Sequence, residues 1–385
     1  MSNDTQPEIR FPGFTEDWEQ RKLGDLGSVA MNKRIFKDQT SDNGEVPFFK
    51  IGTFGSHPDA FISRELFEEY KSKYPYPEVG DILISASGSI GRTVVYQGED
   101  EYFQDSNIVW LKHNGRLDNK FLQQFYSIVK WQGLEGSTIK RLYNKNILDT
   151  NISVPTLDEQ NKLGAFFEQL DDTIALHQRK LDLLKETKKG FLQKMFPKNG
   201  AKVPEIRFPG FTEDWEERRL QEVVDRYDNL RIPITASKRV AGNTPYYGAN
   251  GIQGYVEGYT HDGEFILVAE DGANDLKNYP VQYVDGKVWV NNHAHVIQAK
   301  ENLADNMFLM NAIRSINIEP FLVGGGRAKL NADVLMKLEV IIPLKSEQQK
   351  IGAFFKQLDD TIALHQRKLD LLKETKKGFL QKMFV

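Results

Sequence analysis

EQNKLGAFFEQLDDTIALHQRKLDLLKETKKGFLQKMF, from Glu159 to Phe196, is the stretch that decides how this chain is organised. It returns 188 positions later as EQQKIGAFFKQLDDTIALHQRKLDLLKETKKGFLQKMF, from Glu347 to Phe384. The two copies differ only at Asn161/Gln349, Leu163/Ile351 and Glu168/Lys356. A near-identical internal repeat of this length indicates a duplicated structural element.

Each copy is predicted to form one long helix that packs against a partner helix. Apolar residues recur at intervals of three, four or seven, which is the spacing of a helix that buries one stripe, although His177, Lys188, His365 and Lys376 interrupt it. The stripe consists of Phe167, Leu170, Ile174, Leu181, Leu184, Phe191 and Met195 in the first copy, and of Phe355, Leu358, Ile362, Leu369, Leu372, Phe379 and Met383 in the second. Asp158 and Ser346 are the expected N-caps, and Pro197 is expected to end the first helix. We expect an antiparallel coiled coil, because the first helix leads from one domain to the next and the second must return.

The bulk composition indicates a protein with a real core. The chain has 385 residues, 40 % of them hydrophobic, enough for two or three domains. No apolar run is long enough to span a membrane, and the start lacks the apolar core of a secretory signal. There are no cysteines, which fits a reducing cytoplasm. The net charge of −4 does not by itself indicate nucleic-acid binding, so any DNA contact must come from local basic patches.

A second repeat shows that the whole chain is a tandem duplication. PEIRFPGFTEDWEQRKL, from Pro7 to Leu23, returns as PEIRFPGFTEDWEERRL, from Pro204 to Leu220. The expected order is therefore leader, variable region and long helix, twice. This predicts a first domain over 1–158, a long helix over 159–196, a linker over 197–203, a second domain over 204–346 and a second long helix over 347–385.

The variable regions are predicted to be compact α+β domains with small mixed sheets and many loops. The expected strands are Val46–Ile51, Asp81–Ser85, Thr93–Tyr96 and Asn107–Leu111 in the first region, and Gly254–Val256, Phe265–Ala269, Val281–Val284 and Val288–Val290 in the second. The expected helices are Phe121–Trp131 and Met307–Ile316.

A weaker similarity relates the two variable regions. Leu142 aligns with Leu330, Gly136 with Gly324, Asn151–Pro155 with Glu339–Pro343, and Gly80–Ser85 with Gly263–Val268. The fold is therefore expected to be shared, with diverged loops. Two diverged domains on near-identical spacers suggest two readers of different specificity on one frame.

Several motifs carry a family resemblance that covers nearly the whole chain. They are FPGFTEDWE in both leaders, GDILISASGSIG at Gly80–Gly91, GSTIKRLYNKNIL at Gly136–Leu148, and the EQ-x-K-[LI]-G-x-FF-x-QLDD opening of both long helices. Together they resemble the specificity subunit of type I restriction–modification systems. The second domain departs from the pattern, because VAEDGAND at Val268–Asp275 replaces SASGSIG.

The resemblance implies a function, partners and cofactors. Each variable region would be a target recognition domain that reads one half of a bipartite site in double-stranded DNA. The paired helices would set the half-site spacing and dock two methyltransferase subunits, to which restriction or translocase subunits add. The chain itself would be non-catalytic, cytoplasmic and free of cofactors, with S-adenosylmethionine, ATP and magnesium belonging to its partners.

Polar and basic loop residues are the expected DNA contacts, because their donors and acceptors reach base edges and phosphates. In the first domain these are Lys33, Arg34, Ser85, Ser87, Ser89, Arg92, Lys140, Arg141 and Asn144. In the second they are Arg231, Lys238, Arg239, Asn250, Asn274, Asn291, Asn292, His293, Arg327 and Lys329. Lys140, Arg141, Arg327 and Lys329 are favoured as a group, because they follow glycines that let a backbone approach closely.

Motifs of catalysis are absent from the sequence. The chain has no Pro-Pro, so the N-P-P-[YF] loop of amino-methyltransferases is missing, and so is a G-x-x-x-x-G-K-[ST] phosphate loop. His293 and His295 have no third metal ligand at motif spacing, so no metal site is predicted. Two alternatives to a DNA-reading scaffold stay open: a stand-alone DNA-modifying or DNA-cleaving enzyme, and a coiled-coil adaptor that binds proteins.

Overall fold

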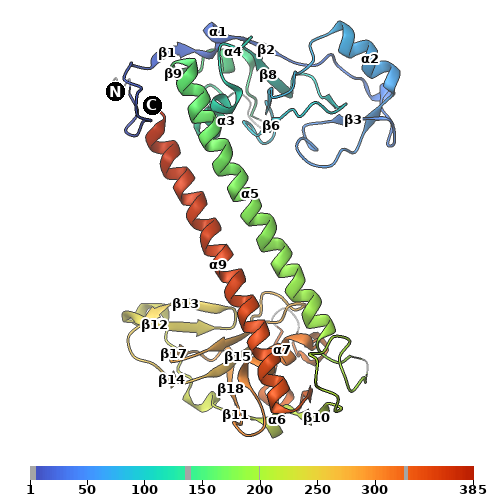
Figure 1. Ribbon diagram of the computed structural model, residues 1–385, viewed down its shortest axis with the longest axis vertical. Helices are drawn as coiled ribbons and strands as arrows, with labels where there is room; N and C mark the ends of the chain where they lie inside the picture. The colour runs from blue at the N-terminus through green and yellow to red at the C-terminus, as the bar shows by residue number, and fades with distance from the viewer. Residues whose placement is uncertain (1–5, 135–139, 199, 325–327) are drawn as a thin grey trace. The chain divides into compact units, whose positions relative to one another are not determined.

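The computed structural model describes residues 6–134, 140–198, 200–324 and 328–385 (Figure 1). The chain divides into two compact units. The first consists of the chain up to His177 together with Lys368–Val385, and the second is Gln178–Arg367. Each unit thus contains one α+β domain and a segment of both long helices. The predicted α+β class and the two long helices are confirmed.

In the first unit two sheets share a hydrophobic core between them. The larger sheet has the order β2-β8-β5-β6, the smaller β4-β3-β7, and β1 pairs with β9. The bounds are β1 Glu19–Lys22, α1 Leu23–Leu26, β2 Ser28–Ala30, β3 Val46–Phe49, β4 Phe61–Ile62, α2 Arg64–Lys73, β5 Ile82–Ser85, β6 Thr93–Val95, β7 Tyr102–Phe103, β8 Ile108–Lys112, α3 Asn119–Ile128, α4 Asn144–Leu148 and β9 Asn151–Val154.

The second unit repeats this plan with one additional strand, β13, and with some longer strands. Its sheets are β11-β18-β15-β16 and β13-β12-β17-β14, and β10 pairs with β19. The bounds are β10 Glu216–Arg219, α6 Leu220–Val223, β11 Val224–Arg226, β12 Ala241–Gly248, β13 Gly251–Val256, β14 His261–Asp262, β15 Phe265–Ala269, β16 Val281–Val284, β17 Lys287–Val290, β18 Ala294–Ala299, α7 Asn306–Ser315, α8 Ala332–Met336 and β19 Glu339–Ile342.

Strand alternation explains how strands β5 and β15 contribute to two cores, since both are buried along their whole length. Successive side chains of a strand point to opposite faces. In β5, Ile82 and Ile84 therefore join the core formed with α3 and the long helices. Leu83 joins a second core with the smaller sheet. In β15, Ile266 and Leu267 divide between the two cores in the same way.

The repeated sequences form helices α5 (Leu157–Lys194) and α9 (Lys345–Met383). Both begin earlier than predicted, so the N-cap assignments to Asp158 and Ser346 were wrong and these residues lie inside the first turn. The hydroxyl of Thr156 instead accepts a hydrogen bond from Glu159 N at 3.4 Å. Sequence alone favoured Asp158 because an acidic residue suits both the N-cap and the first turn.

Within each unit the segments of α5 and α9 run antiparallel. In the first unit Phe166 contacts Phe379, and Asp171 forms an ion pair with Lys376 at 2.6 Å. In the second unit Phe191 contacts Phe354, and Lys188 pairs with Asp359. In both units, residues nearer the C-terminal end of the α5 segment contact residues nearer the N-terminal end of the α9 segment, as antiparallel helices do.

The predicted stripe is largely shielded from solvent. Leu181 and Leu369 are 1 % exposed, and Phe167 and Phe355 are fully buried in the domain cores. The remaining stripe residues are buried or half-buried; they are Leu170, Ile174, Leu184, Phe191, Met195, Leu358, Ile362, Leu372, Phe379 and Met383.

The leaders hold the ends of the long helices against the domains. Trp18 packs edge-on against Phe121 and Phe384. Trp215 packs in the same manner against Phe308 and Phe196. Among the described residues, no helix is both long enough and apolar enough to cross a membrane.

Candidate nucleic-acid interface

In the first unit, the chain leaving strand β5 forms a small backbone frame with two other segments. Ala86 N donates to Asn107 O at 2.7 Å, and Leu142 N donates to Ala86 O at 2.8 Å. Ser87 and Arg141 form an isolated antiparallel bridge. Gly88 follows with φ of 64°, a left-handed conformation that glycine adopts without strain. The frame therefore joins the end of β5, the start of β8 and the approach to α4.

The second unit builds the same frame from different residues. Glu270 N donates to His293 O at 2.8 Å, and Leu330 N donates to Glu270 O at 2.7 Å. Asp271 and Lys329 form the bridge, and Gly272 follows with φ of 70°. We call the two arrangements the first and second reading frames.

This register corrects the predicted alignment of Gly80–Ser85 with Gly263–Val268 by one residue. Ser85 pairs with Ile108 and Ala269 pairs with Ala294, so Ser85 corresponds to Ala269. A shift of one residue turns every side chain to the other sheet face. Ile84 and Val268 both face the helices, and that burial decides the register.

The side chains on the two frames differ in chemistry. In the first, Ser87 Oγ donates to Asn107 Oδ1 at 2.8 Å, and Arg141 Nη2 donates to Asn107 Oδ1 at 3.3 Å. In the second, Asp271 Oδ1 lies 2.5 Å from His293 Nδ1, and Lys329 Nζ lies 2.8 Å from Glu270 Oε1. The first frame thus presents a hydroxyl, an amide and a guanidinium group. At the corresponding positions the second frame presents a carboxylate, an imidazole and an ammonium group.

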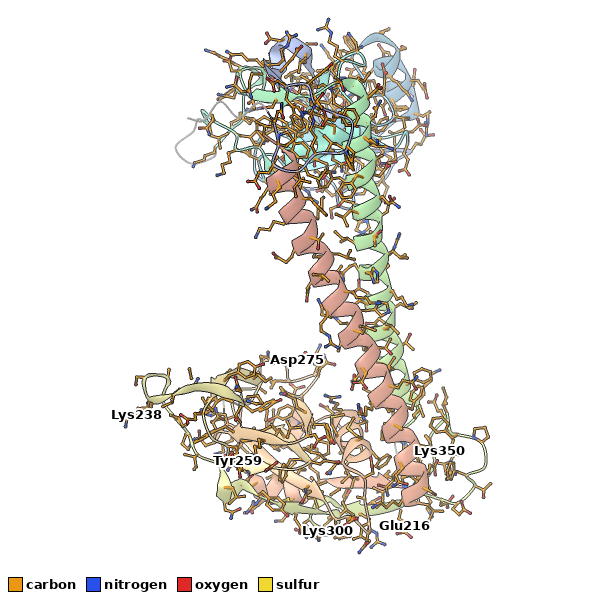
Figure 2. All side chains as sticks on the ribbon, turned by 60° about the vertical axis from the view of Figure 1, so that its left-hand side comes forward. Glu216, Lys238, Tyr259, Asp275, Lys300 and Lys350 are labelled. Atoms are coloured by element: carbon orange, nitrogen blue, oxygen red, sulfur yellow. The ribbon has the colours of Figure 1, made fainter. Side chains whose placement is uncertain are left out.

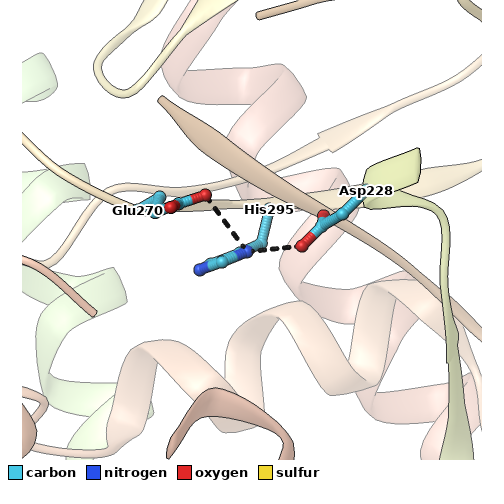
Figure 3. Close-up of side chains that lie close together, drawn as sticks. All are labelled: Asp228, Glu270 and His295. Atoms are coloured by element: carbon cyan, nitrogen blue, oxygen red, sulfur yellow. Dashed lines mark hydrogen bonds and ion pairs between the residues drawn. The ribbon is translucent and has the colours of Figure 1, made fainter. Parts of the chain in front are cut away.

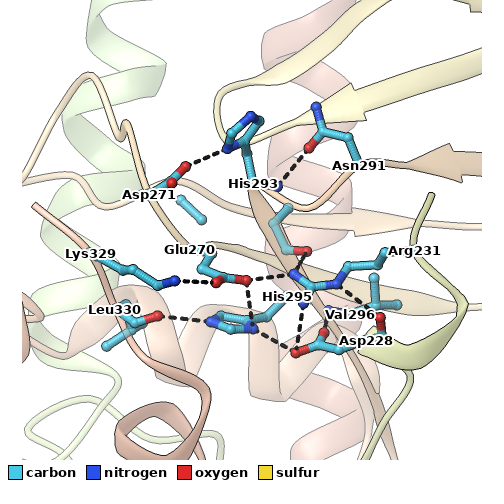
Figure 4. A network of polar contacts seen from close by, with 12 residues as sticks. Asp228, Arg231, Glu270, Asp271, Asn291, His293, His295, Val296, Lys329 and Leu330 are labelled. Carbon is cyan, nitrogen blue, oxygen red and sulfur yellow. Dashed lines mark hydrogen bonds and ion pairs between the residues drawn. The ribbon is translucent and has the colours of Figure 1, made fainter. Parts of the chain in front are cut away.

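A charged network lies beneath the second frame (Figure 4). Arg231 Nη1 is 2.6 Å from Glu270 Oε2, and Lys329 binds the other oxygen of this carboxylate. His295 is buried, with Nδ1 2.7 Å from Asp228 Oδ2 and Nε2 2.8 Å from the carbonyl oxygen of Leu330. Both partners of His295 are acceptors, so the ring donates to both only when both nitrogens carry protons. The network therefore anchors residues 329–330 to β15 and β18.

The network keeps both of its carboxylates ionised. Burial opposes ionisation of Asp228, but the hydrogen bond and charge of His295 outweigh it, so the pKa of Asp228 lies below its usual value. Burial likewise opposes ionisation of Glu270, but the hydrogen bonds from Lys329 and Arg231 leave its pKa lowered. Asp228, Glu270 and His295 bring ligand atoms within 4.8 Å of one another, close enough for a metal ion (Figure 3). Arg231 and Lys329 already form ion pairs with the Glu270 carboxylate and so supply positive charge there.

The other predicted contacts of the first unit are mostly on the surface. Lys33, Arg34, Ser89, Lys140 and Asn144 are exposed, and Arg92 is exposed while its Nη2 donates to Gly55 O at 2.9 Å. Ser85 is different, because it is 1 % exposed and its hydroxyl accepts from Arg92 N at 3.0 Å. Ser85 thus shapes the turn that ends at Arg92 and does not face solvent.

In the second unit, Lys238, Asn250, Asn274 and Asn292 are exposed. Asn250 is tied to the loop after β15, since its Nδ2 donates to Gly272 O and its Oδ1 accepts from Asn274 N. Arg239 stacks on the ring of Tyr246, 4.1 Å from its centroid. Asn291 is 3 % exposed and accepts from His293 N, so it supports the frame from within. Arg327 lies outside the described residues.

Sequence reasoning did not identify Asn107, Asp228, Glu270 or Asp271 as parts of this interface. The available signal was the turn after a buried strand: Asp271-Gly272 follows β15 as Ser87-Gly88 follows β5. Asn107 and Asp228 carry no motif of their own. Only the pairing of distant strands brings them to the frames.

The chain is similar to proteins of one family. The family model described as type I restriction modification DNA specificity domain matches it twice, at residues 15–186 and 212–374. A protein of Haemophilus influenzae named as a type I restriction enzyme specificity subunit is 56 % identical over 151 residues, and the match spans 39 % of each chain. A protein of Methanocaldococcus jannaschii named as the MjaX specificity subunit is 23 % identical, over 95 % of this chain and 92 % of its own. The crystal structure of a type I restriction–modification S subunit from M. genitalium shares the fold, with a TM-score of 0.71, 15 % identity and 99 % of each chain covered.

Proposed function

The chain belongs to the family of type I restriction modification DNA specificity domains, and from this premise we propose that it is the specificity subunit of a type I restriction–modification complex. Each unit reads one half of a bipartite target in double-stranded DNA. The chain selects the site, and its partners carry out the chemistry.

The observation that carries this proposal is the pair of reading frames. The same backbone hydrogen bonds hold Ser87, Asn107 and Arg141 in one unit and Asp271, His293 and Lys329 in the other. A protein that only joined partners would have no use for one frame carrying two sets of base-reading chemistry. Amide and guanidinium groups form bidentate contacts with adenine and guanine edges, respectively. Different side chains on a common frame therefore support two half-sites of different sequence.

We further propose that α5 and α9 form an antiparallel coiled coil that docks two methyltransferase subunits. Support comes from leucines that the helix pairing leaves uncovered. Leu176 and Leu183 are 59 % and 67 % exposed, and Leu364 and Leu371 are 45 % and 67 % exposed. Each pair lies seven residues apart on one helix face, which is the spacing of a surface that receives further helices.

The remaining components belong to the complex. We propose that the methyltransferase subunits hold S-adenosylmethionine, and that restriction or translocase subunits use ATP and magnesium. Because the target is chromosomal or invading DNA, the complex works in the cytoplasm.

Methylation mapping of cells that carry this chain and its methyltransferase tests the function. The wild type should give one bipartite motif. Ser87→Asp combined with Asn107→His, which places second-frame side chains on the first frame, should change or blur the first half-site only. The reciprocal Asp271→Ser with His293→Asn should affect the second half-site only. Absence of a bipartite motif, or equal changes in both half-sites, would refute the assignment.

A further inference from the structure

A basic cavity of about 570 Å³ lies in the second unit, between helix α5, the loop before β16 and helix α7. Its wall on α5 consists of Lys185, Glu186, Lys188, Lys189 and Leu192. The opposite wall is formed by residues 278–282 and Arg314. Four cations thus surround a cavity to which the lining contributes a single carboxylate.

Asp359, a carboxylate outside the lining that contacts two of these cations, does not balance this charge. It pairs with Lys188 and lies 3.5 Å from Arg314 Nη1, so two half-buried cations share it. Burial lowers the pKa of Lys188, and the charge of Arg314 lowers it further. Arg314 Nη1 is buried without a hydrogen-bond partner among the described residues. No described residue forms an ion pair with Lys185 or Lys189. The cavity therefore favours an anionic ligand.

Helix pairing does not require the extra cation. In the first unit the equivalent ion pair joins Lys376 to Asp171. Helices α3 and α7 both begin after an aspartate N-cap, Asp118 and Asp305. Counting from these caps places Ser127 of the first unit at the position of Arg314. The first unit forms its helix contact without an arginine there. In the second unit Nε and Nη2 of Arg314 donate to Val281 O at 3.0 and 2.6 Å, so strand β16 holds this side chain beside the cavity.

The position of the cavity indicates which anion it takes. Its loop wall continues from the residues that follow the second reading frame, Asp271 to Asn278. Asp275 of this loop lies at the opposite edge of the second unit from Lys300 and Glu216 (Figure 2). Residues 278–282, which continue this loop, line the cavity together with Lys185 and Lys189, so a duplex read at Asp271, His293 and Asn274 would carry its backbone toward these lysines. Lys185 lies about 200° around α5 from Leu183, so a partner docked on that leucine leaves the cavity open.

We infer that this cavity binds phosphate groups of duplex DNA next to the second half-site, so that α5 contacts the target itself as well as partner subunits. Lys185 and Lys189 make the outer phosphate contacts. Lys188 and Arg314 add positive electrostatic potential to the cavity. This inference rests on the proposed DNA-reading function. Phosphate contacts position a protein on DNA without reading sequence. The cavity thus contributes affinity and leaves the motif unchanged.

Salt-dependent binding by the chain in complex with its methyltransferase subunits tests this inference. The probes are a duplex that carries the methylation motif and an unrelated duplex of equal length. Each phosphate contact contributes about 0.9 to the slope of log K against log salt concentration. Lys185→Ala with Lys189→Ala should lower the magnitude of that slope by about 2 on both duplexes, with the methylation motif intact. Lys202→Ala with Lys337→Ala removes the same charge from two exposed lysines outside the cavity, and it should leave the slope at the wild-type value.

Three results would overturn the inference. The double variant could keep the wild-type slope, or it could change the methylation motif. Alternatively, inorganic phosphate or ATP could raise the melting temperature of the wild-type complex but not of the double variant, with an unchanged slope for DNA; the cavity would then take a small anion. A wild-type complex that fails to bind DNA would refute the proposed function instead, and that outcome is separate from these three.

Discussion

Arg10 and Glu159 form a bidentate ion pair, with Nε 2.7 Å from Oε1 and Nη2 2.8 Å from Oε2. The pair joins the leader to the first turn of α5, and Arg207 and Glu347 repeat it with the same two distances. The Glu159 side chain is 1 % exposed and that of Arg10 is 11 % exposed. The duplicated leader and the duplicated helix are therefore two parts of one structural unit.

Arg10→Ala should destabilise the first unit by about 3 kcal/mol, because it leaves a buried carboxylate without its partner. The measurement is urea unfolding followed by tryptophan fluorescence. Arg21→Ala is the control, since both side chains of the Arg21–Glu19 pair are exposed and the pair should be worth less than about 1 kcal/mol. Equal losses in the two variants would show that the bidentate pair is not the stabilising contact.

Replacing Gly164 and Gly190 of α5 by alanine should change the stability of the protein in opposite directions. A Cβ at Gly164 would stand 2.7 Å from Lys120 Cβ and 2.9 Å from Phe121 N, so Gly164→Ala must push α3 away. Apart from its chain neighbours and its own helix backbone, no described residue has an atom within 4 Å of a Cβ placed at Gly190. Gly190→Ala should therefore stabilise the helix by about 0.5–1 kcal/mol, while Gly164→Ala lowers the melting temperature. A stabilising Gly164→Ala would contradict the close approach of α3 to α5.

Acid should weaken the second unit through its charged network. The pKa values of Asp228 and Glu270 are lowered in the folded state, so each group contributes stability above its unfolded pKa, about 3.9 for Asp and 4.3 for Glu. That contribution is lost as the pH falls through the lowered folded values. Asp228→Asn should flatten the decline of unfolding free energy below about pH 4, whereas Glu257→Gln, at an exposed carboxylate, should leave it unchanged. A wild-type-like pH profile for Asp228→Asn would contradict this.

Leu183→Asp should weaken binding of the methyltransferase subunit at least about tenfold, equivalent to about 1.4 kcal/mol. The reason is that a leucine that is 67 % exposed contributes little to the fold but can be buried by a partner. Isothermal titration measures the affinity, and circular dichroism checks that the helix remains. Leu181→Asp serves as the contrast, because Leu181 is 1 % exposed and its replacement should unfold the helix pair. Undiminished binding by a folded Leu183→Asp variant would exclude this face from docking.

Insertion of four residues after Leu184 should widen the unspecific gap of the target by one or two base pairs. Four helical residues add about 6 Å, and a base pair rises about 3.4 Å. The half-sites should keep their sequences, because the reading frames are untouched. Four residues inserted between Asn114 and Gly115, in a turn outside the long helices, should leave the gap as it is. The methylation motif before and after insertion is the measurement, and altered half-sites with an unaltered gap would rule out the helices as the spacer.

Local patterns predicted elements better than they predicted correspondences between the units. Strands β15 and β16 have the bounds that were predicted for them. The alignment of Gly80–Ser85 with Gly263–Val268 was nevertheless one residue off, because short apolar runs look alike in either register. Burial of Ile84 and Val268 against the helices decides between the registers, and burial is a property of the folded unit.

By itself, the sequence determined the duplication, the α+β class, the two long helices and the family, because repeats, periodicity and motifs are all local in the chain. Only the tertiary structure decided the reading frames. Ser87 meets Asn107 and Arg141, and Asp271 meets His293 and Lys329, because strands distant in sequence pair at a definite register. The cavity beside Lys185 depends likewise on residues 278–282 and Arg314 folding back onto α5. Such sites arise from long-range packing, which no spacing along a single chain encodes.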